Sequence, residues 1–148
     1  MSPRVPAATE PAAQAASQRS VYERLGGAEG VAMLVARFYR LMDELPEAYR
    51  VRRMHPESLA GSADSLFKFL SGWFGGPPLY VAERGHPRLR MRHLPYAIGR
   101  VERDEWLLCM RQALAEQVHD GALRALVDRA FTEMADHMVN TVASTGGQ

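Results

Sequence analysis

The sequence contains very little cysteine and no long hydrophobic run. Its 148 residues include a single cysteine, Cys109. One thiol cannot form an internal disulfide, and it cannot build a CxxC zinc site or a CxxCH haem-attachment site. No stretch approaches twenty consecutive apolar residues, which excludes a membrane-spanning helix. We therefore expect a cytoplasmic protein in a reducing compartment.

An excess of charge of either sign is also missing. The chain has 18 lysines and arginines, 17 aspartates and glutamates, and a formal net charge of +1. A dedicated nucleic-acid-binding domain usually carries a strongly basic face, so this balance argues against that class. Hydrophobic residues make up 47% of the chain, which argues against wholesale disorder. At this length the chain is expected to fold as one domain.

Both ends of the chain lack the patterns of folded structure. Residues 1–19 are rich in alanine and proline and contain no continuous apolar block, so they do not resemble a secretory signal. The last six residues read ASTGGQ. We predict disordered tails over 1–19 and 143–148, and a folded domain over 20–142.

Familiar catalytic motifs are absent: HExxH, the glycine-rich phosphate loop GxxxxGKS/T and GxSxG do not occur. Glu102, Asp104 and Glu105 lie together, but they stand at the start of a predicted helix, where carboxylates complement the helix dipole. A helix-turn-helix needs a basic recognition helix, and the most basic stretch here is interrupted by prolines. Neither pattern therefore predicts a function.

The folded domain is predicted to be all-α, because no stretch alternates apolar and polar residues as a strand would. Ser20 and Glu23 form a capping box that opens a short helix, and the glycine pair at 26–27 ends it. Longer helices are predicted over about 29–44, 62–74, 101–118 and 121–142, with an irregular stretch over 46–56. The residues expected to face the core are Val31, Leu34, Val35, Phe38, Leu41, Met42, Leu66, Phe69, Leu70, Trp73, Phe74, Trp106, Cys109, Met110, Ala113, Leu114, Leu123, Leu126, Val127, Ala130, Phe131, Met134 and Met138.

One segment is unusually basic and carries two histidines. Residues 84–98 read RGHPRLRMRHLPYAI. His86 and His93 are spaced by close to two helical turns, so they are expected to share a face of one short helix that Pro95 ends. Such a helix can hold a metal, an anionic ligand or nothing, and this segment alone does not decide between them.

The surroundings of His93 favour ligand binding. Leu89 lies one turn earlier on the same face, and Arg92 is the preceding residue. Together they predict an apolar slot with a cationic rim, which suits a flat ligand with a metal at its centre and carboxylates at its edge. Haem fits that description, because histidine supplies an axial nitrogen and arginine pairs with a propionate. His119 and His137 have no such surroundings and are interpreted as structural histidines.

The far side of such a ligand needs a lining from other predicted helices. Tyr39, Leu66, Phe69 and Trp106 are candidates for this lining. Tyr39 and Trp106 also form, with His55, a set of hydrogen-bond donors for a bound oxygen ligand. Taken singly, Tyr39 and Trp106 are better explained as core aromatics whose polar atoms are satisfied locally.

Several sequence strings together carry a family resemblance. They are YERLGG at 22–27, RFYRL at 37–41, FGGPPLY at 74–80, RGHPRLRMRH at 84–93 and ERDEWLLCM at 102–110. In this order they resemble the truncated haemoglobins of group II, the O type, and the resemblance extends from Val21 to Thr141. It implies a two-over-two helical sandwich around a non-covalent haem b, iron protoporphyrin IX.

The resemblance also implies a role for individual positions. His93 is similar to the proximal iron ligand, and Tyr39, Trp106 and His55 are similar to the distal residues that stabilise a bound ligand. Arg92 is implied as the main partner of a haem propionate. The positions implied to contact the cofactor are Leu59, Ser62, Leu66, Phe69, Tyr80, His86, Leu89, Arg92, Tyr96 and Ile98.

The function implied by the resemblance is binding of O2, or of NO, CO or another small ligand, on iron held by His93. Two alternatives stay open. One is an enzyme that oxidises NO or turns over peroxide and takes electrons from a separate donor. The other is a haem-free helical interaction module. Neither a nucleic acid nor a membrane is expected as a partner.

Overall fold

The computed structural model describes residues 19–141, and this part of the chain is helical without any strand, which confirms the all-α prediction. In chain order its elements are α2 (Val21–Arg24), α3 (Gly27–Glu44), the 3-10 helix η1 (Pro46–Ala48), α4 (Tyr49–Arg53), α5 (Ala60–Trp73), α6 (Leu79–Arg84), α7 (Leu89–His93), α8 (Arg100–Gln117) and α9 (Gly121–Met138). No helix in this range is long and apolar enough to cross a membrane. The tails predicted over 1–19 and 143–148 lie, apart from Arg19, outside the described residues.

The capping box predicted at the start of the fold is present. The Ser20 hydroxyl accepts a hydrogen bond from the backbone N–H of Glu23 at 3.1 Å, and the Glu23 carboxylate accepts one from the backbone N–H of Ser20 at 3.3 Å. Gly26 then adopts a φ of 107°, a left-handed conformation that favours glycine. The chain therefore leaves α2 and starts α3 in a new direction, as the glycine pair predicted.

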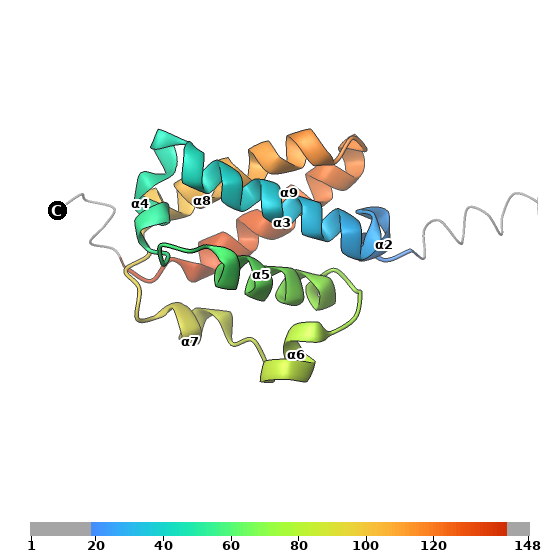
Figure 1. The fold of residues 1–148 in the computed structure, drawn as a ribbon, viewed down its shortest axis with the longest axis horizontal. Coiled ribbons are helices and arrows are strands. Elements are labelled where there is room, and N and C mark those ends of the chain that lie inside the picture. Colours follow the sequence, from blue (N-terminus) through green and yellow to red (C-terminus); the bar gives the residue numbers. More distant parts are fainter. Residues whose placement is uncertain (1–18, 142–148) are drawn as a thin grey trace, which may run out of the picture.

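The four long helices form two layers (Figure 1). α3 packs against α5, α8 packs against α9, and contacts between α3 and α8 join the layers. Residues at the centre of this core, such as Phe38, Leu70, Met110 and Phe131, are fully buried. The arrangement is the two-over-two sandwich that the family resemblance implies.

Two residues predicted to face the core are substantially exposed. Trp73 is 38% exposed because it stands at the end of α5, where its ring stacks on Phe69 at 5.6 Å between centroids. Leu126 is 45% exposed because the buried stripe of α9 follows Leu123 and Val127, and Leu126 stands to one side of it. The predictions for these two side chains were wrong, although both helices were correctly placed.

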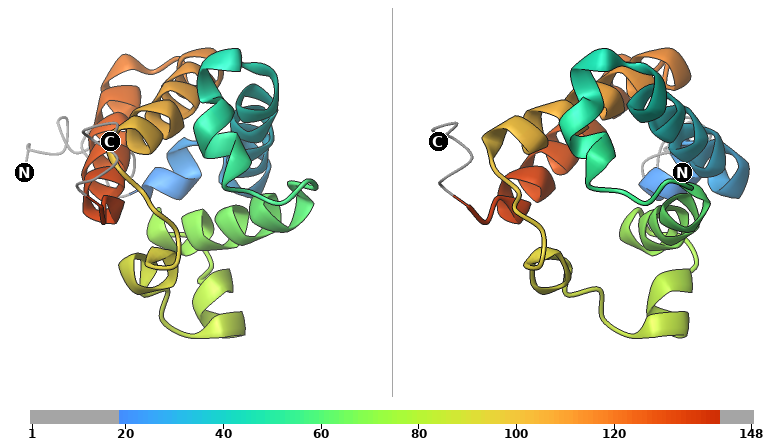
Figure 2. Two further views of the ribbon diagram at one scale, coloured as in Figure 1. Left: turned by 90° about the vertical axis from the view of Figure 1, so that its left-hand side faces the viewer. Right: turned by 60° about the vertical axis from the view of Figure 1, so that its left-hand side comes forward.

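The prediction of one helix carrying both His86 and His93 was also wrong. α6 ends at Arg84, and α7 begins only at Leu89, so His86 lies in the link between two helices. Gly85 has a φ of 80° and Arg88 a φ of 46°, both incompatible with a continuous right-handed helix. Pro87 adds to the break, because a residue before proline disfavours the helical region. Figure 2 shows the two short helices as separate turns joined by an extended stretch.

Two further boundaries differ from the predictions. The stretch over 46–56, predicted to be irregular, contains η1 and α4. α9 ends at Met138, before the predicted boundary at 142, because the next residues form other hydrogen bonds. The backbone N–H of Asn140 donates to the carbonyl oxygen of Ile98 at 2.8 Å, which fixes the end of α9 beside the start of α8.

Candidate functional site

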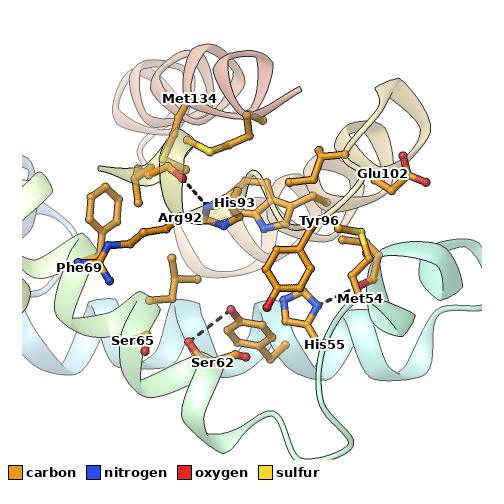
Figure 3. A pocket seen from close by; sticks show the side chains of 18 of the residues that line it. Met54, His55, Ser62, Ser65, Phe69, Arg92, His93, Tyr96, Glu102 and Met134 are labelled. Atoms are coloured by element: carbon orange, nitrogen blue, oxygen red, sulfur yellow. Dashed lines mark hydrogen bonds between the residues drawn. The ribbon is translucent and has the colours of Figure 1, made fainter. Parts of the chain in front are cut away.

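A cavity of about 580 Å³ lies between α3, α5, α6, α7, α8 and α9. Its volume falls within the range of about 300–1,000 Å³ that is usual for small-molecule and cofactor sites. The site residues predicted from the sequence that line it are Tyr39, His55, Ser62, Leu66, Phe69, Tyr80, Leu89, Arg92, His93, Tyr96, Ile98 and Trp106. Figure 3 shows side chains from these distant parts of the sequence gathered around one space.

His93 stands at the end of α7 and is half-buried in the cavity wall. Its Nδ1 lies 2.6 Å from the carbonyl oxygen of Leu89, one turn earlier (Figure 3). Because a carbonyl oxygen can only accept, Nδ1 carries the proton, and Nε2 of the neutral ring keeps its lone pair. No residue in the described range forms a hydrogen bond with Nε2. This imidazole is therefore oriented and protonated as a metal ligand requires.

His55 uses the same type of anchor from another part of the chain. It follows α4, and its Nδ1 lies 2.8 Å from the carbonyl oxygen of Val51, four residues earlier. Burial in the cavity wall lowers the pKa of the His55 imidazole, the hydrogen bond to Val51 opposes this shift, and the charge of Arg52 adds to it. His55 is thus held as a neutral ring, with Nδ1 occupied by the backbone.

Two aromatic side chains bring polar hydrogens into the cavity. Tyr39 on α3 is only 8% exposed, and its hydroxyl donates to the carbonyl oxygen of Ser62 at 3.4 Å, which is a long and weak hydrogen bond. Burial raises the pKa of the Tyr39 phenol far above its ordinary value, so it keeps its proton. Trp106 on α8 packs its ring edge-on against Phe38 at 4.9 Å between centroids, and its indole N–H has no partner among residues 19–141.

An arginine at the mouth of the cavity has no counter-ion among residues 19–141. Arg92 is exposed on α7, and its guanidinium stands over the Tyr80 ring at 5.7 Å from the centroid. None of the carboxylates in the described part of the chain forms an ion pair with it. Arg84, on the neighbouring helix, also faces the Tyr80 ring, at 5.2 Å, and donates to the hydroxyl of Ser65 at 2.8 Å. The cavity therefore has a cationic rim over an aromatic ring.

Comparisons with known proteins agree with this geometry. A sequence profile of the bacterial-like globins matches residues 20–140. The group 2 truncated hemoglobin YjbI of Bacillus subtilis is 37% identical over 119 residues, which are 80% of this chain and 87% of the relative. The chain belongs to the group II truncated haemoglobins.

Solved structures support the same assignment. The group II 2-on-2 hemoglobin of Agrobacterium tumefaciens is 46% identical, covers 83% of this chain and 95% of its own, and superimposes with a TM-score of 0.81. A truncated haemoglobin from Bacillus subtilis, described as oxygen-avid, is 36% identical, with coverage of 82% and 100% and a TM-score of 0.74. As a member of this family, the chain is a haem-binding globin.

The cavity of this globin has the chemistry that haem requires. One imidazole nitrogen with a free lone pair suits the iron, and the guanidinium of Arg92, which pairs with no carboxylate of residues 19–141, suits a propionate. Between them the wall is apolar, with Leu66, Phe69 and Ile98 suited to the porphyrin plane. The residues present therefore fit the cofactor of the family.

Two of the residues predicted to contact the cofactor do not line the cavity of this globin. Leu59 precedes α5 and packs against the hydrophobic core. His86 is exposed in the link between α6 and α7, because Gly85 and Pro87 turn the chain there. The structure thus places both side chains away from the cavity wall, unlike the other residues predicted to contact the cofactor.

Sequence reasoning missed the residues that hold the His93 segment in place. The Asn140 side-chain amide donates to the carbonyl oxygens of His93 at 3.1 Å and Tyr96 at 2.9 Å, and its oxygen accepts from the N–H of Ile98 at 3.0 Å. Arg90 donates to the carbonyl oxygen of His137 in the last turn of α9 and to that of Val139 just after the helix, each at 2.8 Å. Nothing near Asn140 in the sequence signals this role, because its partners are more than forty residues away.

Proposed function

We propose that this globin holds haem b through Nε2 of His93 and binds O2 and other diatomic ligands. The observation that carries the proposal is the hydrogen bond from Nδ1 of His93 to Leu89, which leaves Nε2 free toward the cavity. When bound, haem supplies an iron with one open coordination position for a small ligand. The oxygen-avid description of the Bacillus subtilis relative favours O2 as that ligand.

The far side of the cavity supplies hydrogen-bond donors for such a ligand. The hydroxyl of Tyr39 makes only a weak hydrogen bond to Ser62, and the indole N–H of Trp106 has no partner within the described part of the chain. His55 lines the same space, but its Nδ1 donates to Val51, so its Nε2 carries a lone pair and accepts; in this tautomer His55 is not the donor that the sequence predicted. Donors fixed by the fold stabilise negative charge on a ligand without reorganisation, so they slow its escape.

The rim of the cavity supplies the cation for the cofactor's carboxylates. Arg92 has no carboxylate partner among the described residues, and its guanidinium stands over the Tyr80 ring. A propionate beside this guanidinium gains a charge-assisted hydrogen bond. We assign Arg92 to this contact, and the cation–π contact with the Tyr80 ring holds its guanidinium in place.

A second function is favoured by the same set of donors. Two donors around one ligand, from Tyr39 and Trp106, oppose rapid release, which suits a reaction of the bound ligand better than its delivery. Oxidation of NO would consume one NO, one O2 and one electron for each nitrate formed, and the electron would come from a separate donor. Peroxide turnover is the other reaction of this class.

Two measurements on haem-loaded protein separate these functions. Stopped-flow rates of O2 dissociation test the binding function, and slow dissociation is expected. Anaerobic mixing of the O2-loaded protein with NO tests the reaction, and stoichiometric nitrate is expected if the globin acts as an NO dioxygenase. Failure of the ferrous protein to bind O2 at all would reject both functions.

A further inference from the structure

A buried carboxylate lies behind the cavity and has no role in the function proposed above. Glu105 precedes Trp106 on α8 and is only 7% exposed. It does not line the cavity. Burying a carboxylate is costly unless it finds partners, so the contacts of Glu105 indicate what it does.

Glu105 caps a helix that cannot cap itself. The residue before α4 is Ala48, which has no side-chain acceptor, and the helix has only five residues. The Glu105 carboxylate accepts a hydrogen bond from the backbone N–H of Val51 at 2.9 Å and one from the guanidinium of Arg50 at 3.3 Å. A helix this short is unstable by itself and depends on such external contacts.

The same peptide segment anchors a histidine of the cavity. The backbone N–H of Val51 donates a hydrogen bond to Glu105, and the carbonyl oxygen of Val51 accepts one from Nδ1 of His55 at 2.8 Å. The two contacts lie on one residue, so a shift of Val51 moves the anchor of His55. A continuous path thus runs from the buried carboxylate on α8, through one backbone residue, to the imidazole in the cavity wall.

We propose that Glu105 is a positioning residue that holds the His55 ring in the cavity wall with Nδ1 protonated, so that Nε2 faces a haem ligand as an acceptor. The inference rests on the proposed function, in which His55 faces that ligand. The helix-dipole interpretation does not account for Glu105, because Glu102 occupies the first turn of α8 and caps it by accepting from the N–H of Gly99 at 2.8 Å. Glu105 lies almost one turn further on and points to α4 instead.

Two substitutions separate the acceptor from the volume of the side chain. Glu105→Gln keeps a carbonyl acceptor for the N–H of Val51, whereas Glu105→Leu keeps the volume and removes the acceptor. Asp104→Asn is the matched control, because it removes a carboxylate from the same helix at an exposed position. Urea unfolding of each variant verifies that the fold is retained.

The first readout is the tautomer of His55, measured by long-range ¹H–¹⁵N NMR on the full chain with and without haem. We expect the Nδ1-protonated tautomer in the wild type, in Glu105→Gln and in Asp104→Asn, and a mixture of tautomers in Glu105→Leu. An unchanged tautomer in Glu105→Leu would overturn the inference. This readout does not depend on ligand binding, so it decides the positioning role even if the protein fails to take up haem.

The second readout is O2 dissociation from the haem-loaded protein, measured in a cycle with His55→Leu. We expect Glu105→Leu, which lets Nε2 of His55 carry a proton and donate to the ligand, to slow dissociation by at least about threefold in the wild type and by less than about twofold in the His55→Leu background. Equal effects in both backgrounds would show that Glu105 does not act through His55, and the inference would fail. Loss of haem binding by the wild type itself would instead reject the proposed function.

Discussion

His93 and His55 enter one cavity with the same anchor, since in each ring Nδ1 hydrogen-bonds to the backbone carbonyl oxygen four residues earlier. The distances are 2.6 Å to Leu89 and 2.8 Å to Val51. In both rings this bond fixes the tautomer and frees Nε2. The supports behind the two rings differ, because Asn140 ties down the His93 segment and Glu105 ties down α4. The two histidines can therefore be perturbed separately.

The assignment of the iron ligand predicts a contrast between two histidines of the same basic segment. His93→Ala removes the only imidazole of that segment in the cavity wall, so we expect haem to be lost or to exchange freely. His86→Ala is the control, because His86 is exposed in the α6–α7 link and should leave the spectrum unchanged. Absorbance of the two purified proteins measures the difference. A normal five-coordinate ferrous spectrum in His93→Ala would refute the assignment.

The distal donors predict faster loss of O2 when either is removed. Tyr39→Phe and Trp106→Phe each delete one buried hydrogen bond to the ligand, worth about 1–3 kcal/mol. By the usual conversion, O2 dissociation should accelerate roughly five- to hundredfold. Stopped-flow replacement of O2 by CO measures these rates.

Tyr22→Phe is the matched control for the distal variants. Tyr22 packs on Gly76 outside the cavity, and its substitution should leave the O2 dissociation rate unchanged. Wild-type rates in both Tyr39→Phe and Trp106→Phe would contradict the role given to these two donors.

The hydrogen bonds of Asn140 to the His93 segment predict that haem retention depends on this residue, although it lies outside the cavity. Asn140→Asp keeps the shape of the side chain but replaces its two N–H donors by an acceptor that faces the carbonyl oxygens of His93 and Tyr96. We expect the free energy of unfolding to fall by about 1–3 kcal/mol and haem to transfer faster to apomyoglobin. Asn140→Ala should have the smaller effect, because it removes the bonds without adding repulsion. Equal haem transfer from Asn140→Asp and wild type would be the contrary result.

The buried thiol of Cys109 leads us to expect a loss of folding stability at alkaline pH. Burial, helped by the negative charge of Glu105, raises the pKa of the thiol from 9.0 to about 11. Between these values the unfolded chain releases the thiol proton while the folded chain retains it, so stability present below pH 9 is lost as the pH rises to 11. The slope should be about 1 kcal/mol per pH unit. Urea unfolding at several pH values measures it, and Cys109→Ala should lack this part of the slope. An identical pH dependence in both proteins would disprove the thiol's contribution.

The periodic parts of the fold were predictable because local rules decide them. The capping box at Ser20, the helix through Phe38 and the helix through Met110 all follow from residues near in sequence. The same reasoning failed for His86, where spacing alone suggested a shared helical face. Pro87 already opposed that interpretation, since it restricts the residue before it. The local backbone rule was the stronger signal.

The supports of the cavity were not predictable from the sequence. Asn140 binds residues more than forty positions away, and Glu105 binds Val51, 54 positions away. Contacts of this kind exist only once the helices have packed, so no periodicity or motif marks them. For that reason the sequence suggested that Glu105 complements the dipole of its own helix, α8. In the structure its carboxylate instead binds a backbone N–H at the start of α4.

Titration of the haem-free protein with haemin shows whether His93 holds a porphyrin in this cavity. We expect a sharp absorbance band near 400 nm that saturates at about one haemin per chain, because the cavity offers one axial imidazole from the basic segment. A protein that stays colourless after reconstitution, or binds haemin equally well as His93→Ala, would contradict this role of His93.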